Sequence, residues 1–254
     1  MPREMIDLSV PLHNGTFDDM ALDIQYIAHE ENGRRWAKRF GVEVSDLPYG
    51  HGSSSEKITL MSHCGTHIDA PYHYAPTNSE GKPARTIDML ELKHFFSDAF
   101  CLDFTHRKPA QRISPSEIEK ALKTIQYTVK AGDIALIHTG ATRYYNSPKF
   151  LDIQPGLTRE SVFYLVDRGV KVIGIDAWGL DIPFSAMARE LKEGIQGTFW
   201  QSHFAGKEKE YFQIEKLANL DKLPRPHGFQ VACFPVLIER ASGAWCRAVA
   251  IFED

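Results

Sequence analysis

Three histidines and one aspartate crowd into a short stretch of this sequence, residues 63–73, which reads HCGTHIDAPYH in one-letter code. The whole chain has only 11 histidines among 254 residues, so this local density is unusual. Imidazole nitrogens and carboxylate oxygens are good ligands for Zn²⁺ and Mn²⁺. The residue types in this stretch therefore predict a metal site.

The spacing inside the stretch predicts how the ligands converge. Gly65 and Thr66 follow a strand pattern and predict a tight turn, with glycine supplying an unusual backbone dihedral. Residues two apart on a strand point to the same side, as His67 and Asp69 would. Together with His63 they would form a site that leaves positions open for water and substrate.

His73 lies four residues beyond Asp69, after the rigid Pro71. A neutral imidazole beside a metal-activated hydroxide is suited to proton transfer at neutral pH, so we expect His73 to be the catalytic acid/base. Two other interpretations are weaker. The histidines could be hydrogen-bonded groups at a sheet edge, or Cys64 could be a nucleophile, although the Asp69 carboxylate suits a metal better than a thiolate pair.

The elements that must position these residues alternate between strands and helices, which predicts one α/β domain over residues 1–254. The run Ser114 to Glu117 is a capping box that starts a helix toward Tyr127, and Thr158 caps a second helix through Arg168. Gly169 is the expected left-handed residue after that helix. Short apolar runs predict strands at 5–10, 100–104, 134–138, 170–175, 230–237 and 245–252, several of them buried on both faces. Residues 57–62 alternate between polar and apolar types, which predicts a half-buried strand.

Segment 14–55 is a long excursion between the first two strands, with a short helix near residues 30–40. Excursions of this length are often lids or binding loops, and an oligomer-contact arm is the equal alternative. Trp36, Phe40 and Tyr72 lie in or beside the excursion and the histidine stretch. Their rings could stack on a flat substrate, although ordinary packing is the simpler explanation for any one of them.

The composition excludes several classes of partner. Net charge is −4 and the pI is about 6.3, so no basic field points to nucleic acid or an anionic membrane. The four cysteines form no C-x-x-C pair, the N-terminus lacks a signal-peptide core, and no run of 18 apolar residues exists. We therefore expect a cytoplasmic protein with no membrane partner.

The seven fixed positions of H-x-G-T-H-x-D-x-P-x-H, here His63 to His73, resemble the signature of the cyclase family of metal-dependent hydrolases, which includes kynurenine formamidase and isatin hydrolase. The segments 6–9, 174–176 and 213–220 resemble the family's opening, its strand ending in aspartate and its C-terminal glutamate stretch. The resemblance implies a swivelling β/β/α domain with mixed sheets and a homo-oligomer, a dimer or a tetramer.

The same resemblance implies the ligands. His63, His67 and Asp69 would hold a first ion, and the same aspartate with His203 and Glu215, 12 residues apart, would hold a second. Kynurenine formamidases have two ions, whereas isatin hydrolases hold one manganese and lack the glutamate. Glu215 favours a site with two ions, whereas the long excursion resembles isatin hydrolases and favours a single ion. We therefore expect zinc or manganese, with one or two ions per chain.

These features predict an amidohydrolase, enzyme class EC 3.5. A metal-activated hydroxide would attack an amide-type C–N bond in a cyclic amide or imide or an N-formyl arylamine, and the acid/base histidine would protonate the leaving nitrogen. The substrate would be a small aromatic or cyclic molecule. A lactone or ester hydrolase with the same site and a non-catalytic metal-binding module remain alternatives.

Overall fold

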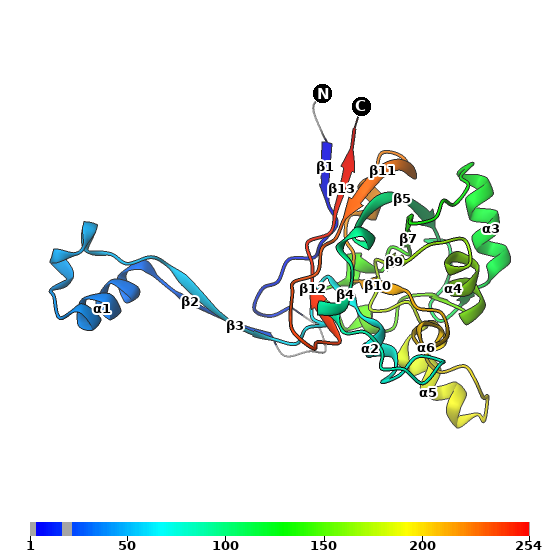
Figure 1. Cartoon of the computed structure of the whole chain (residues 1–254), viewed down its shortest axis with the longest axis horizontal. Helices are drawn as coiled ribbons and strands as arrows, with labels where there is room; N and C mark the ends of the chain where they lie inside the picture. Colours follow the sequence, from blue (N-terminus) through cyan, green and yellow to red (C-terminus); the bar gives the residue numbers. More distant parts are fainter. Residues whose placement is uncertain (1–3, 17–21, 254) are drawn as a thin grey trace. The chain divides into compact units, whose positions relative to one another are not determined.

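The computed structural model describes residues 4–16 and 22–253, which fall into two compact units. Unit 1 joins Met1–Pro11 to Ser62–Asp254, and unit 2 is Leu12–Met61. Figure 1 shows both units. The histidine stretch and both distant candidate ligands belong to unit 1, so that unit is described first.

Unit 1 is built on a nine-stranded mixed sheet in the order β1-β13-β11-β5-β7-β9-β10-β4-β12 (Figure 1). Neighbours within β5-β7-β9-β10 are parallel, and the outer pairs are antiparallel. The strands of this sheet are β1 (Glu4–Asp7), β4 (His67–Asp69), β5 (Phe96–Asp103), β7 (Ile134–His138), β9 (Val172–Ile175), β10 (Phe212–Glu215), β11 (His227–Ala232), β12 (Gly243–Trp245) and β13 (Val249–Phe252). A separate short pair joins β6 (Arg112–Ile113) to β8 (Gly156–Leu157).

The central strands are covered on both faces because their apolar side chains alternate between two cores. Ala135 and Ile137 of β7 pack with helix residues such as Leu165, whereas Ile134 and Leu136 pack into a second core. The helices of unit 1 are α2 (Pro71–Tyr74), α3 (Pro115–Thr124), α4 (Arg159–Val166), α5 (Phe184–Lys192) and α6 (Gln201–Glu208). The predicted α/β fold with mixed sheets is confirmed.

The predicted helix starts hold, while several element ends differ. Ser114 and Glu117 form the capping box of α3, and the Thr158 hydroxyl accepts from the Ser161 amide at 3.2 Å at the start of α4. The helices end earlier than predicted, at Thr124 and Val166. The opening strand ends at Asp7, the strand predicted at 230–237 ends at Ala232, and the run 245–252 is split between β12 and β13.

Unit 2 pairs β2 (Leu22–Ile27) with β3 (Ser55–Leu60) in an antiparallel ribbon that flanks helix α1 (His29–Phe40). The helix matches the one predicted near 30–40. The strand predicted at 57–62 as half-buried is wrong in that respect, because β3 is exposed along nearly its whole length. Each strand of a two-stranded ribbon pairs with one other strand only. Alternation of polar and apolar residues along such a strand therefore does not show that other elements cover one of its faces.

Unit 2 contains the predicted 14–55 excursion, and its role as a lid or an oligomer contact stays a prediction, as does the single-domain organisation. Among residues 4–16 and 22–253, no helix has both the length and the apolar composition needed to span a bilayer.

Candidate metal centre

Strand β4 presents His67 and Asp69 on the same side of the sheet, as their spacing predicts, while Ile68 points into the core. The strand is sandwiched between β10 and β12. Its register with β10 sets Glu215 directly opposite His67. Pairing of β4 with β10 thus brings a carboxylate 148 positions away in sequence beside the histidine stretch.

The tautomer of His67 leaves one ring nitrogen available to bind a metal ion. Its Nδ1 donates to the Gly65 carbonyl at 2.8 Å, so Nε2 carries the lone pair. That Nε2 lies 3.2 Å from Asp69 Oδ1 and 3.5 Å from Glu215 Oε2. Gly65 has φ +66°, the left-handed conformation predicted for this turn.

His63 is fixed by hydrogen bonds at both ring nitrogens. Nδ1 donates to Asp69 Oδ1 at 2.7 Å, and Nε2 accepts from the Ser242 hydroxyl at 2.9 Å. Its ring lies so close to β12 that a Cβ at Gly243 would fall 2.7 Å from His63 Cε1. Only glycine fits at this position without displacing the ring or the backbone.

His203 reaches the site from helix α6, where it is buried. Asp181 accepts from His203 Nδ1 at 2.6 Å, from the His203 amide at 3.2 Å and from the Ser202 amide at 2.8 Å. The second ring nitrogen, Nε2, therefore faces Glu215, 3.6 Å from Oε1. Both residues predicted as ligands of a second ion meet at this point.

His73 projects from α2 into the same cluster of rings. Its ring centroid lies 4.1 Å from that of His63 and 5.5 Å from that of His203. Burial lowers the pKa of His73 from its ordinary value to about 4, although the charge of Asp69 opposes this shift. The imidazole is therefore neutral at pH 7.

Three buried polar atoms at the centre of this cluster have no hydrogen-bond partner within the described part of the chain: His67 Nε2, Asp69 Oδ2 and Glu215 Oε1. Leaving buried polar atoms unpaired is costly, and such groups need an explanation. Ligand atoms of His63, Asp69 and His73 lie within 4.8 Å of one another, as do those of His67, Asp69 and Glu215. The donor set and the unpaired atoms fit a divalent cation, with Asp69 shared by both groups.

The protonation states of the two carboxyl groups differ. Burial acts to raise the pKa of Asp69, but the facing imidazoles of His73, His67 and His63 outweigh it and hold this pKa well below its ordinary value. Burial and the nearby Asp69 charge raise the pKa of Glu215 well above its ordinary value. A bound cation would oppose the second shift, since positive charge favours the ionised carboxylate.

The predicted substrate-contact residues belong to different units, Tyr72 to unit 1 and Trp36 and Phe40 to unit 2. Tyr72 is 46% exposed and, among the described residues, makes no ring contact with the histidines. Trp36 and Phe40 stack on each other in unit 2 with centroids 5.4 Å apart. Their role toward a substrate stays a prediction.

Sequence reasoning missed three contributors to the site. Trp200 stacks on His203 with centroids 4.9 Å apart and lies 6.3 Å from His73. Asp181 and Ser242 orient two of the candidate ligands. Nothing in the local sequence around these three residues distinguishes them from other polar and aromatic residues of the chain. Cys64, the alternative nucleophile, is fully buried.

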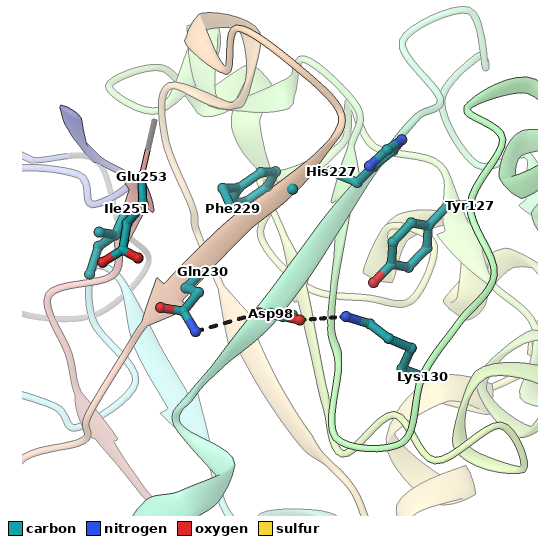
Figure 2. A pocket seen from close by; sticks show the side chains of 9 residues that line it. Asp98, Tyr127, Lys130, His227, Phe229, Gln230, Ile251 and Glu253 are labelled. Carbon is teal, nitrogen blue, oxygen red and sulfur yellow. Dashed lines mark hydrogen bonds and ion pairs between the residues drawn. The ribbon is translucent and has the colours of Figure 1, made fainter. Parts of the chain in front are cut away.

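A hollow of about 360 Å³ lies elsewhere, beside strands β5 and β11 (Figure 2). Its polar side chains already bond to neighbours. Asp98 pairs with Lys130 and accepts from Gln230 at 3.4 Å, and Tyr127 donates to Asp133 at 2.9 Å. This hollow does not have the unpaired buried donors and acceptors of the histidine cluster.

Comparisons with known proteins agree with the motif. A kynurenine formamidase of Bacillus cytotoxicus is 31% identical over 143 residues, covering 56% of this chain and 60% of that relative. The chain thus aligns with less than two thirds of this relative's length. An isatin hydrolase of Roseibium aggregatum is 26% identical over 211 residues, covering 76% of this chain and 73% of the relative. These names agree with the prediction of an amidohydrolase.

The fold has solved counterparts. A crystal structure of an isatin hydrolase bound to the product analogue thioisatinate superposes with a TM-score of 0.77 at 22% identity, covering 99% of this chain and 93% of that one. At this identity the likeness shows the fold alone. The cyclase family model matches residues 6–182, more than half of the sequence. The chain belongs to the cyclase family.

Proposed function

We propose that this chain is a metal-dependent hydrolase of an amide-type C–N bond. The observation that carries the proposal is the trio of buried atoms without hydrogen-bond partners in the described chain, His67 Nε2, Asp69 Oδ2 and Glu215 Oε1. Nitrogen and carboxylate oxygens that converge in a buried place are what a divalent cation of the zinc or manganese type requires.

His63, His67 and Asp69 would hold a first ion, and Asp69, His203 and Glu215 would hold a second. Both ring nitrogens of His63 make hydrogen bonds without an ion, so one of these bonds would give way to the ion. The chemistry that a bound divalent cation supplies is Lewis acidity, which polarises a carbonyl and makes water nucleophilic at neutral pH. Asp181 and Ser242 support this set by fixing the rings of His203 and His63. The metal is zinc or manganese in this proposal, with one or two ions per chain.

His73 would move the proton that the reaction needs. Its neutral imidazole accepts a proton as water adds to the carbonyl, and the resulting imidazolium is stabilised by the Asp69 carboxylate. The same proton then passes to the leaving nitrogen, because an amide nitrogen leaves poorly as an anion. Its position beside His63 keeps this acid/base group next to the candidate ligands.

The substrate class follows from the family and from the aromatic neighbourhood. Relatives are named for kynurenine formamidase and isatin hydrolase activity, which supports an N-formyl arylamine or a cyclic amide or imide. Trp200 adds an aromatic face beside His203 and His73 on which a flat ring could stack. A lactone or ester hydrolase would use the same residues and is the second candidate, and a dimer or tetramer is the proposed assembly.

Metal analysis and matched substrates test the proposal together. The purified protein should contain about one or two zinc or manganese ions per chain, and chelation should abolish hydrolysis that added metal restores. Rates on an N-formyl arylamine, isatin and a lactone of similar shape separate amide from ester hydrolysis. Bound metal with no hydrolysis of any of these substrates would instead support a non-catalytic metal-binding module.

A further inference from the structure

A second polar hollow, of about 620 Å³, lies in unit 1 and contains none of the candidate metal ligands. Ligand pockets are usually 300–1,000 Å³ in volume. Cationic, amide, hydroxyl and apolar side chains all contribute to its wall. The lining residues used below are Val10, His138, Arg143, Ala218, Asp221 and Lys222.

The hollow lies at the carboxyl edge of the parallel strands. Strand β5 ends at Asp103 and β7 ends at His138, and β7 lies between β5 and β9 as a parallel neighbour of both (Figure 1). Segments that follow β5, β7 and β10 supply most of the lining residues. In open α/β sheets, ligands bind in the crevice outside the carboxyl ends of the strands.

The loop after β7 is held in place by Asp176, which follows β9. One oxygen of this buried carboxylate accepts from the Thr139 amide at 2.7 Å and the Thr139 hydroxyl at 2.6 Å. The other accepts from the Gly140 amide at 2.7 Å. Gly140 has φ +73°, which turns the chain into the short 3-10 helix Ala141–Tyr144 that presents Arg143. The loop is therefore ordered before any ligand arrives, which lowers the entropy cost of binding.

Two cations of this hollow have no carboxylate within ion-pair distance anywhere in residues 4–16 and 22–253. Lys222 makes no ion pair there, and Arg143 makes only a cation–π contact with Tyr144, 5.2 Å from the ring centroid. By contrast, Arg85, Arg112 and Arg159 each fork onto a glutamate. The planar donors of Arg143 thus remain available for an incoming carboxylate.

We propose that this hollow binds a small organic carboxylate, with Arg143 and Lys222 contacting the carboxylate group. Val10 and Ala218 supply an apolar wall for the organic body. Asp221 also lines the hollow and limits its positive charge, which disfavours polyanions such as nucleotides. The buried charge of Asp176 is already satisfied by the donors of the loop. This proposal does not depend on the proposed hydrolase activity.

The test is isothermal titration calorimetry on the full chain with benzoate, succinate, neutral benzamide and inorganic phosphate. We expect one carboxylate per chain to bind at this hollow, and both Arg143→Gln and Lys222→Gln to weaken it about tenfold, the loss typical of one charge-assisted pair. Both side chains are exposed, so these variants should fold as the wild type does. Lys120→Gln, which removes an exposed cation from helix α3, should change nothing.

Carboxylates can also bind a metal ion directly, so the titrations are repeated on chelator-treated protein. Saturable benzoate or succinate binding that survives chelation and depends on Arg143 supports the proposal. Equal binding by the two glutamine variants and the wild type would overturn it. So would benzamide or phosphate binding as tight as that of the carboxylates, or no saturable carboxylate binding at all.

Discussion

Asp181 and His203 are joined by a 2.6 Å hydrogen bond between Oδ2 and Nδ1, and this bond determines which nitrogen of His203 faces the site. Because Nδ1 donates to Asp181, Nε2 is the nitrogen that faces the site, 3.6 Å from Glu215 Oε1. Burial acts to lower the pKa of His203, but the hydrogen bond and charge of Asp181 outweigh it and raise this pKa to about 9, so Nε2 must lose a proton to bind an ion. The Asp181 carboxylate is held in turn by the backbone amides of Ser202 and His203. Carboxylate–histidine pairs of this kind orient metal ligands in many proteins.

Asp181→Asn should lower metal affinity by about 10- to 100-fold, the usual cost of losing an outer partner of a histidine ligand. The amide can still accept from the Ser202 amide, but it no longer stabilises the donating tautomer of His203 as a carboxylate does. Competition with a fluorescent chelator measures the affinity. Asp167→Asn, an exposed ion-pair residue, is the matched control. Wild-type affinity in Asp181→Asn would remove His203 from the ligand set.

His73→Ala should reduce kcat by about 10²- to 10⁴-fold while metal content stays at the wild-type level, since general acid–base assistance is typically of that size. The readouts are steady-state kinetics on an N-formyl arylamine and metal analysis of the same sample. His106→Ala, an exposed histidine, controls for loss of an imidazole. A fully active His73→Ala enzyme would assign the proton transfer to another group, and loss of metal would make His73 a ligand.

The sequence predicts those parts of the site in which the contacting residues are close together in the chain. The histidine stretch, its left-handed Gly65 and the strand spacing of His67 and Asp69 follow from neighbours in the chain, and they hold in the structure. The strand at 134–138 was also predictable, because a short continuous run of apolar residues is the pattern of a strand that is buried on both faces. These features required no knowledge of distant segments.

Other features depend on tertiary packing that a local pattern does not encode. Asp181, Trp200 and Ser242 reach the site from segments whose own sequences give no sign of it. The exposure of β3 was missed because alternation of polar and apolar residues does not reveal whether anything covers the strand. The family resemblance, and not local spacing, identified His203 and Glu215.

Gly243→Ala should disrupt the metal centre through steric overlap. A Cβ at Gly243 would fall 2.7 Å from both His63 Cε1 and the Ile68 carbonyl oxygen, and the backbone contact cannot move aside cheaply. Overpacking of this kind costs about 1–3 kcal/mol, and the displaced His63 ring should lower metal affinity at least about tenfold. Thermal unfolding and metal competition measure the two effects.

Gly41→Ala is the control for glycine replacement alone. Gly41 has φ +69° with no atom within 4 Å of an added Cβ, so the substitution adds only backbone strain, of order 1 kcal/mol. It should lower the melting temperature slightly and leave metal affinity unchanged. Equal metal affinity in Gly243→Ala and the wild type would show that the site tolerates a shifted His63 ring.

The thiols should be unreactive in the native protein. Burial raises the pKa of Cys246 to about 12, and burial also raises the pKa values of Cys101 and Cys233. Because a raised pKa keeps a thiol protonated, the thiolate fraction of Cys246 at pH 8 would be about one in 10⁴, whereas an ordinary cysteine of pKa about 8.5 is roughly a quarter ionised. The rate of reaction with a disulfide reagent at pH 8, followed by peptide mapping, measures this.

All four thiols should react promptly once denaturant unfolds the chain, which serves as the internal control. The informative residue is Cys64, which is fully buried within the metal-binding stretch. Slow modification of Cys64 in the native state, together with hydrolysis that survives a Cys64→Ala substitution, would exclude the thiol as the nucleophile. Rapid modification of Cys64 that removes activity while metal content stays constant would favour a cysteine mechanism over the proposed metal-dependent one.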